Sequence, residues 1–211
     1  MCDQTQVNVR NMISSKSQRW LGWRPGSLAK NGGVLLGWML LRTATQTSTI
    51  FLLARQLGAH NYGQVVAVIA MASFLVPVAG LGLSHIVLRN ASRDPTHEPV
   101  YFARALHWWW RTLLPSVAAA IAVAIMLLPN TLVLVAMCTA IASEIAATSM
   151  TELRARHRQA QHRMHAFGAI NAGLPLCRLL AVGLLLLLNH TPTASAVLWV
   201  YATSGLLYLA F

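Results

Sequence analysis

Apolar residues occur in long blocks along this chain, separated by short polar stretches. The blocks lie at about 33–54, 65–88, 108–128, 131–150, 167–188 and 194–211. A helix needs about 20 mainly apolar residues to cross a hydrocarbon core of about 30 Å. The pattern therefore predicts an all-α fold, a polytopic transmembrane helix bundle of about six spans over residues 31–211, preceded by a basic tail over residues 1–30.

The first two blocks are the least regular. The first contains the polar run RTATQTST, and the second is interrupted by Pro77 and by Gly80-Leu81-Gly82. Such breakers are tolerated in membrane helices because neighbouring helices can satisfy the backbone groups that they free. We therefore expect the second span to continue through this interruption.

Composition supports the same class. Of the 211 residues, 56% are hydrophobic and 10% are charged, whereas soluble domains carry about 25% charged residues. The net charge of +11 raises the question of nucleic-acid binding. The basic residues lie mostly between apolar blocks rather than along one solvated face, which is the distribution that membrane topology produces. A nucleic-acid partner is therefore not expected.

The basic residues also predict an orientation. The loops Gln56–Tyr62, Pro129-Asn130 and Asn189–Thr193 carry no Lys or Arg beyond Arg55 at their edge. Loops rich in Lys and Arg stay in the cytoplasm, so the N-terminus is predicted to be cytoplasmic. The first thirty residues lack the apolar core of a cleavable signal peptide. The tail and the two remaining loops hold most of the sixteen basic residues: Arg10, Lys16, Arg19, Arg24, Lys30, Arg89, Arg93, Arg104, Arg111, Arg154, Arg156, Arg158 and Arg163.

Charged residues inside the spans are the main functional candidates, since a charge at membrane depth costs at least about 2.5 kcal/mol and should face the bundle interior. They are Arg42, Glu144 and Arg178. Arg42 shares a helical face with Thr45, Gln46 and Thr49. Facing a cavity, this face could bind a polar substrate; alternatively, its hydroxyls bond to their own helix or to a neighbour.

Glu144 has two interpretations. It pairs with Arg42 or Arg178, which is the commoner arrangement, or it carries a coupling proton or cation. Arg178 is correspondingly either a substrate contact or the structural partner of Glu144.

The sequence offers few residues at spacings suited to catalysis or to metal binding. The chain has five acidic residues, and no pair of them has the spacing of a catalytic site. The eight histidines and three cysteines show no metal-ligand spacing. We therefore expect neither an enzyme nor a cofactor.

A family resemblance is carried by residues 50–89, which read IFLLARQLGAHNYGQVVAVIAMASFLVPVAGLGLSHIVLR. This stretch resembles the N-terminal signature of polysaccharide-transport proteins and O-antigen flippases of the multidrug/oligosaccharidyl-lipid/polysaccharide exporter superfamily. The basic loop and Arg178-containing block at 154–188 also resemble that family. The matching pieces of the signature are Leu53-Ala54-Arg55, Leu57-Gly58, Tyr62-Gly63 and Gly80-Leu81-Gly82. Gly58 and Gly63 would let a short loop turn tightly between two spans.

The resemblance implies a flippase of a bacterial cytoplasmic (inner) membrane, acting in cell-surface polysaccharide biosynthesis such as that of lipopolysaccharide O-antigen. Its substrate would be an oligosaccharide linked to a lipid of the undecaprenyl diphosphate type, and its other contacts would be membrane lipids. A cationic cavity would suit the diphosphate, with Arg42 and Arg178 as candidates.

The chain departs from the family in length. Members usually have twelve or more spans in two lobes, whereas six blocks make one lobe, and the sequence stops within the apolar run GLLYLAF. A fragment, a truncated N-terminal half or a pair of associating copies is therefore expected. A drug or cation antiporter of the same broad fold and a non-transporting fragment remain alternatives.

Overall fold

The computed structural model describes residues 27–127, 134–188 and 192–210. The chain divides into two units, Met1–Gly33 and Val34–Phe211. Only residues 27–33 of the first unit are described, and they form the start of one long helix. The predicted basic tail over residues 1–30 therefore lies almost wholly outside the described residues. The rest of that helix and all the other helices belong to the second unit.

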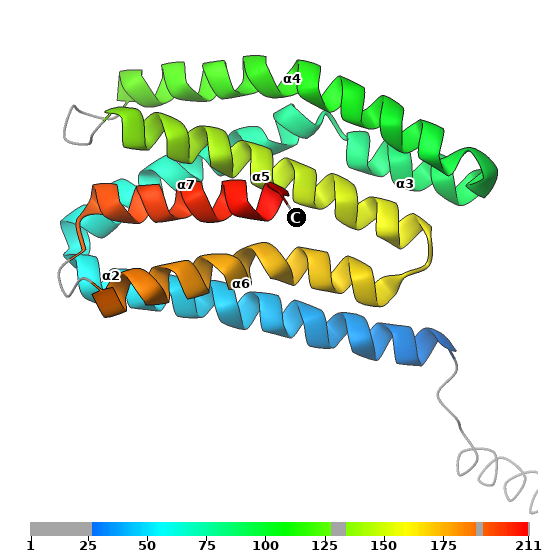
Figure 1. Ribbon diagram of the computed structural model, residues 1–211, viewed down its shortest axis with the longest axis horizontal. Helices are drawn as coiled ribbons and strands as arrows, with labels where there is room; N and C mark the ends of the chain where they lie inside the picture. Colours follow the sequence, from blue (N-terminus) through cyan, green and yellow to red (C-terminus); the bar gives the residue numbers. More distant parts are fainter. Residues whose placement is uncertain (1–26, 128–133, 189–191, 211) are drawn as a thin grey trace, which may run out of the picture. The chain divides into compact units, whose positions relative to one another are not determined.

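Every regular element of the described residues is a helix (Figure 1), which confirms the predicted all-α class. Four helical stretches are long and apolar enough to cross a membrane, and these fit a membrane protein; α7 is apolar but shorter. The predicted count of six spans is not confirmed by this measure. The elements are α2 (Ser27–Gly80), α3 (Leu83–Arg93), the short 3-10 helix η1 (Pro95–His97), α4 (Glu98–Leu127), α5 (Leu134–Ala160), α6 (Met164–Leu188) and α7 (Ala194–Ala210).

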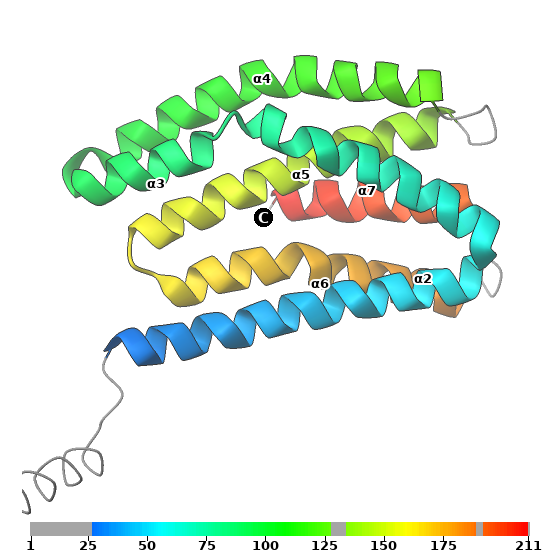
Figure 2. The same cartoon turned by 180° about the vertical axis from the view of Figure 1, so that it is seen from behind.

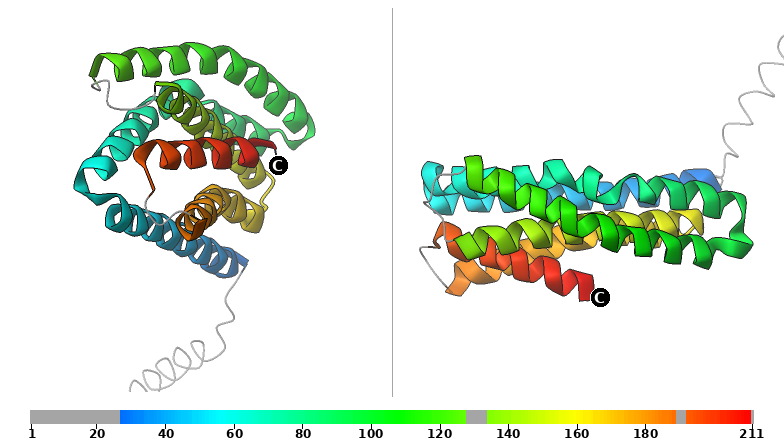
Figure 3. Two further views of the ribbon diagram at one scale, coloured as in Figure 1. Left: turned by 60° about the vertical axis from the view of Figure 1, so that its left-hand side comes forward. Right: turned by 90° about the horizontal axis from the view of Figure 1, so that it is seen from above.

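The helix α2 turns back on itself at Gly58. The apolar stretch Asn31–Arg93 has 63 residues, and a straight helix of that length would extend about 95 Å, three times a hydrocarbon core. Gly58 is non-helical, with φ 71° and ψ 167°, a region that essentially only glycine occupies. It separates a first limb, residues 34–57, from a second limb, residues 59–80, and Figure 3 shows the reversal.

Two sequence expectations about this turn need correction. The predicted loop Gln56–Tyr62 is helical apart from Gly58. The positive-φ glycines are Gly58 and Gly82, so Gly63 takes no special conformation within the described residues. One glycine therefore makes the turn, because a single residue with a non-helical φ and ψ is enough to redirect a helix.

A second break divides the predicted span 65–88. The helix α2 ends at Gly80, Leu81 and Gly82 have φ values of 41° and 67°, and α3 begins at Leu83. Near the break, the Thr112 hydroxyl of α4 donates to the Ala79 carbonyl at 2.7 Å. A neighbouring helix thus satisfies a backbone group beside the interruption, as membrane breakers require.

The helices extend beyond the predicted blocks at one end of the unit. The connection between α3 and α4 and the connection between α5 and α6 lie at this end, which we call the basic end; the turn within α2 lies at the opposite end (Figures 1 and 2). α5 continues to Ala160, so much of the predicted basic loop is helical. The basic residues at or near this end include Arg89, Arg93, Arg104, Arg154, Arg156, Arg158 and Arg163.

The connection at the basic end is held by polar contacts. The His97 ring lies 2.7 Å from Asp94, and this hydrogen bond lowers the pKa of the Asp94 carboxyl below its ordinary value. Glu98 instead accepts from Gln161 at 2.6 Å and lies 3.2 Å from His157. His97 and Glu98 thus bind different partners, and α4 is fastened to the end of α5.

The helix α5 is the centre of the packing. It contacts α3, α4, α6 and α7, and it lies between α4 and α6 in Figures 1 and 2. Small residues let the helices approach closely, as is typical of membrane bundles: a Cβ on Gly205 of α7 would lie 3.4 Å from the Ala147 side chain. The Trp109 indole of α4 donates to the buried Ser149 hydroxyl at 2.8 Å.

The turn at Gly58 gives a first testable prediction. Gly58→Ala should lower the free energy of unfolding by about 1–3 kcal/mol, because its φ and ψ are unfavourable for any side chain. Gly63→Ala is the matched control: its Cβ would meet no atom within 4 Å, and stability should stay unchanged or rise by up to about 1 kcal/mol. Unfolding of the full chain in mixed micelles measures both, and equal stabilities would contradict the glycine-dependent turn.

Candidate functional site

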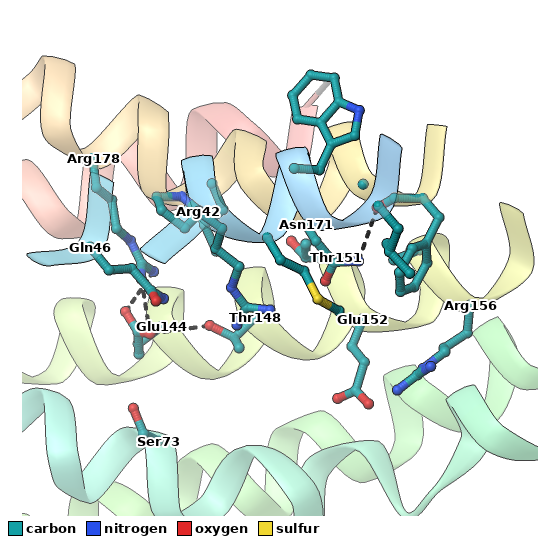
Figure 4. Close-up of a pocket in the computed structure, with 18 residues that line it drawn as sticks. Arg42, Gln46, Ser73, Glu144, Thr148, Thr151, Glu152, Arg156, Asn171 and Arg178 are labelled. Atoms are coloured by element: carbon teal, nitrogen blue, oxygen red, sulfur yellow. Dashed lines mark hydrogen bonds and ion pairs between the residues drawn. The ribbon is translucent and has the colours of Figure 1, made fainter. Parts of the chain in front are cut away.

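A cavity of about 500 Å³ lies between the first limb of α2, α5 and α6. Each of these helices lines it with residues at helical spacing, so each contributes one face. Figure 4 shows the labelled side chains of these helices around the opening. The polar and charged residues that line it are Arg42, Gln46, Ser73, Glu144, Thr148, Thr151, Glu152, Arg156, Asn171 and Arg178.

Glu144 and Arg178 form an ion pair in this cavity. Arg178 Nη1 donates to Glu144 Oε1 at 3.1 Å, and Nη2 lies 2.6 Å from Oε2. The Arg178 side chain is 13% exposed and the Glu144 side chain is 7% exposed. The Thr148 hydroxyl donates to the Glu144 carboxylate at 3.1 Å. Of the two sequence interpretations of Glu144, the structure thus has the pairing with Arg178, which joins α5 to α6 through one charge-assisted hydrogen bond and one close ion-pair contact.

The third helix at this ion pair is α7. The Arg178 guanidinium carbon lies 5.2 Å from the centroid of the Tyr201 ring, within the range of a cation–π contact.

The ion pair lies well inside its two helices. From Glu144 and from Arg178, α5 and α6 each extend ten residues toward the end opposite the basic end, a length of about 15 Å. This is half the thickness of a hydrocarbon core of about 30 Å.

The polar face of the first limb divides into two parts. Arg42 and Gln46 are exposed and line the cavity, whereas Thr45 and Thr49 are 5% and 4% exposed. The Thr45 hydroxyl donates to the carbonyls of Leu41 and Arg42, and the Thr49 hydroxyl donates to the Thr45 carbonyl. The threonine hydroxyls therefore bond to their own helix, the alternative that the sequence left open.

Arg42 differs from the other cationic side chains of the cavity. Arg178 pairs with Glu144, and Arg156 donates to Gln159 at 2.9 Å and lies over the Phe167 ring. Within the described part of the chain, the Arg42 guanidinium has neither an ion-pair nor a hydrogen-bond partner. It is therefore a cation open to a ligand.

A second cavity of about 430 Å³ lies toward the end opposite the basic end. It is bounded by residues 46–53 of the first limb and 62–73 of the second limb, and by Tyr201 of α7. Thr49 lines this cavity rather than the first, and Thr45 lines neither. The two cavities share Gln46, Ser73, Glu144, Pro175 and Arg178.

Sequence reasoning missed part of the site on α5. Glu144, Thr148, Glu152 and Arg156 recur every four residues and all line the first cavity, and Glu152 accepts from the Ser84 hydroxyl at 3.3 Å. The spacing was a readable signal for one helical face. The predicted span ends at residue 150 because the apolar block ends there, so the residues that follow it are predicted to form a loop.

The first limb is seated on α6 by a tryptophan. A Cβ on Gly168 would lie 2.5 Å from the Trp38 ring, so only glycine allows this approach. The His165 ring packs edge-on against Trp38, with centroids 5.2 Å apart. This contact places a side chain of the first limb, one turn before Arg42, directly against α6.

No family model, curated protein or solved structure matches this chain. Within residues 27–127, 134–188 and 192–210, no group of three or more His, Cys, Asp or Glu side chains could hold a metal ion.

The ion pair gives a second prediction. Glu144→Ala and Arg178→Ala should each destabilise the protein, and the double variant should be less destabilised than the sum of the two by about 1–3 kcal/mol. The reason is that each single variant leaves a charge at membrane depth without its partner. A double-mutant cycle of unfolding in mixed micelles measures this coupling, and additive effects would contradict an energetically important pair.

The seating of α2 on α6 gives a third prediction. Gly168→Ala should lower the free energy of unfolding by about 1–3 kcal/mol, because its methyl group overpacks against Trp38. Gly183→Ala, on the same helix and with no atom near its Cβ, is the control and should not be destabilised. Trp38→Ala should relieve the effect of Gly168→Ala, and failure of that relief would show that the glycine acts elsewhere.

Proposed function

We propose that this chain is a membrane lobe that takes part in moving a lipid-linked oligosaccharide across a bilayer. The observation that carries the proposal is the open cation Arg42 in a cavity that also contains the polar side chains of Gln46, Asn171 and Arg178. A guanidinium at membrane depth is costly unless it serves a partner. A phosphate-bearing headgroup is such a partner, because guanidinium binds phosphate through charge-assisted hydrogen bonds.

The remaining polar residues of the cavity suit a sugar. The amide groups of Gln46 and Asn171 can exchange hydrogen bonds with sugar hydroxyls, and the Thr148 oxygen can accept from one while its own proton stays hydrogen-bonded to Glu144. The lipid tail would stay in the bilayer, against the apolar surfaces of the helices. The resemblance of residues 50–89 to O-antigen flippases and polysaccharide-transport proteins supports the same substrate class, of the undecaprenyl diphosphate type.

We further propose six crossings: the first limb, the second limb together with α3, and one each for α4, α5, α6 and α7. The reversal at Gly58 supports two crossings within the long stretch Asn31–Arg93. The concentration of arginines at the basic end supports a cytoplasmic location for that end, and with it for the N-terminus. By the family resemblance, the membrane is a bacterial inner membrane.

The first cavity has walls from α2, α5 and α6, and we propose that a second lobe or a second copy of this chain supplies the facing wall. This follows the two-lobe arrangement of the family that the sequence resembles. Within such a pair, alternating access would expose Arg42 first to one leaflet and then to the other.

A second candidate is a cation antiporter. The carboxylates Glu144 and Glu152 both line the first cavity, and acidic residues within spans are typical of proton and cation coupling. The pairing of Glu144 with Arg178 makes this candidate the weaker one, since the carboxylate is already neutralised. Antiport requires a carboxylate, whereas glycan translocation requires Arg42.

Substitution of Arg42 tests the proposal and gives a fourth prediction. Arg42→Ala should reduce surface-glycan export by about tenfold or more, because a charge-assisted hydrogen bond contributes about 1.5–3 kcal/mol. Arg55→Ala is the control: Arg55 lies on the same limb and lines neither cavity. Export in a complementation assay, together with the amount of protein in the membrane, measures both variants.

Two outcomes would contradict the proposal. Full export by Arg42→Ala at normal protein level would remove the cationic site from the function. Cation or drug transport by the chain that is lost in Glu152→Gln but retained in Arg42→Ala would favour the antiporter instead.

A further inference from the structure

The Glu144–Arg178 pair lies where the two cavities meet. Both residues line the first cavity, which lies toward the basic end, and the second cavity, which lies toward Gly58. Gln46, Ser73 and Pro175 also line both cavities. Figure 4 shows Arg178 and Gln46 directed toward Glu144 across the opening. A path from one cavity to the other therefore passes this cluster, which spans α2, α5 and α6.

The pair also holds its helices together at that depth. Glu144 on α5 and Arg178 on α6 meet through two contacts, and Tyr201 of α7 lies beside the guanidinium. Separating Glu144 from Arg178 would remove this link between α5 and α6. The pair is therefore both the boundary between the cavities and a fastening between the helices that form them.

We propose that the Glu144–Arg178 pair is a latch that separates the two cavities, and that a phosphate-bearing headgroup opens it by replacing Glu144 on Arg178. The inference rests on the proposed function and adds the step that connects the two sides. The ligand that we propose is anionic and enters the first cavity from the basic end. Arg42 lines that cavity.

Three features of the pair suit such an exchange. Phosphate presents paired oxygens to a guanidinium as a carboxylate does, so it can take the place of Glu144. The Nε atom of Arg178 has no hydrogen-bond partner among the described residues, and a further phosphate oxygen can accept from it. Glu144 keeps the Thr148 hydroxyl as a donor after the exchange.

Affinity for inorganic pyrophosphate tests the exchange. Glu144→Gln removes the internal competitor of the anion, so the full-length chain in nanodiscs should bind pyrophosphate about tenfold more tightly than the wild type. Glu152→Gln is the matched control, since it removes the same charge from the same cavity without touching the pair. Its affinity should change less than about threefold, the effect of the general field alone.

Thiol accessibility tests the separation of the cavities. In a cysteine-free version of the full chain, Ala70→Cys reports on the second cavity, and Asn171→Cys reports on the first cavity. A membrane-impermeant thiol reagent added from the basic end should label Asn171→Cys and leave Ala70→Cys unlabelled. Adding Glu144→Gln, or pyrophosphate, should make Ala70→Cys reactive from that side.

The outcomes separate the two proposals. If pyrophosphate binds and Arg42→Ala abolishes its binding, but Glu144→Gln behaves like Glu152→Gln, the latch is wrong and the proposed function stands. If pyrophosphate binds to no version of the chain, the anion site is wrong, and the proposed function and the latch fail together. Labelling of Ala70→Cys from the basic end in the otherwise wild-type chain would also overturn the latch. Unchanged labelling of Asn171→Cys in each variant shows that the fold is retained, and Arg178→Lys, which loses the two-point contact, should open the latch partly.

Discussion

A buried carboxylate is strongly stabilised by a cation beside it, and the pairing of Glu144 with Arg178 is the constraint on which this structure most depends. The pair fixes the rotation of α5 relative to α6, because both side chains must point into the same space. With that rotation set, the residues one, two and three turns along α5 face the same cavity. The polar lining is thus a consequence of one electrostatic requirement applied to a regular helix.

Small residues complete this arrangement. Glycine at position 168 admits Trp38, and Gly205 lets α7 approach α5. The first limb of α2 is held at Trp38, near the basic end, while Arg42 and Gln46, one and two turns farther along, stay exposed to the cavity. Close packing at one place and open space at the next explain why a bundle with so many apolar residues has a polar cavity.

The proposed role in glycan translocation joins these features without an added cofactor. Arg42 would bind an anionic headgroup, amides and hydroxyls would contact sugar, and the ion pair at the boundary of the cavities would control passage. These groups are distributed over α2, α5 and α6, so movement of one helix relative to another could change access. The opposite wall of the path would come from a second lobe or copy.

The sequence by itself determined the all-helical class, the membrane character and the charged residues worth following, since apolar blocks, basic flanks and isolated charges are local signals. It also marked Gly58 as a place where the chain turns. Only the tertiary structure decided that Glu144 pairs with Arg178 rather than with Arg42. It also decided that the Thr45 and Thr49 hydroxyls bond to their own helix, and that Glu152 and Arg156 line the first cavity. These outcomes depend on helix rotation and on how far α5 extends past its apolar block, and neither quantity is set by hydropathy. A hydropathy profile measures the preference of each segment for lipid, whereas the direction of a side chain is fixed by the helices packed around it.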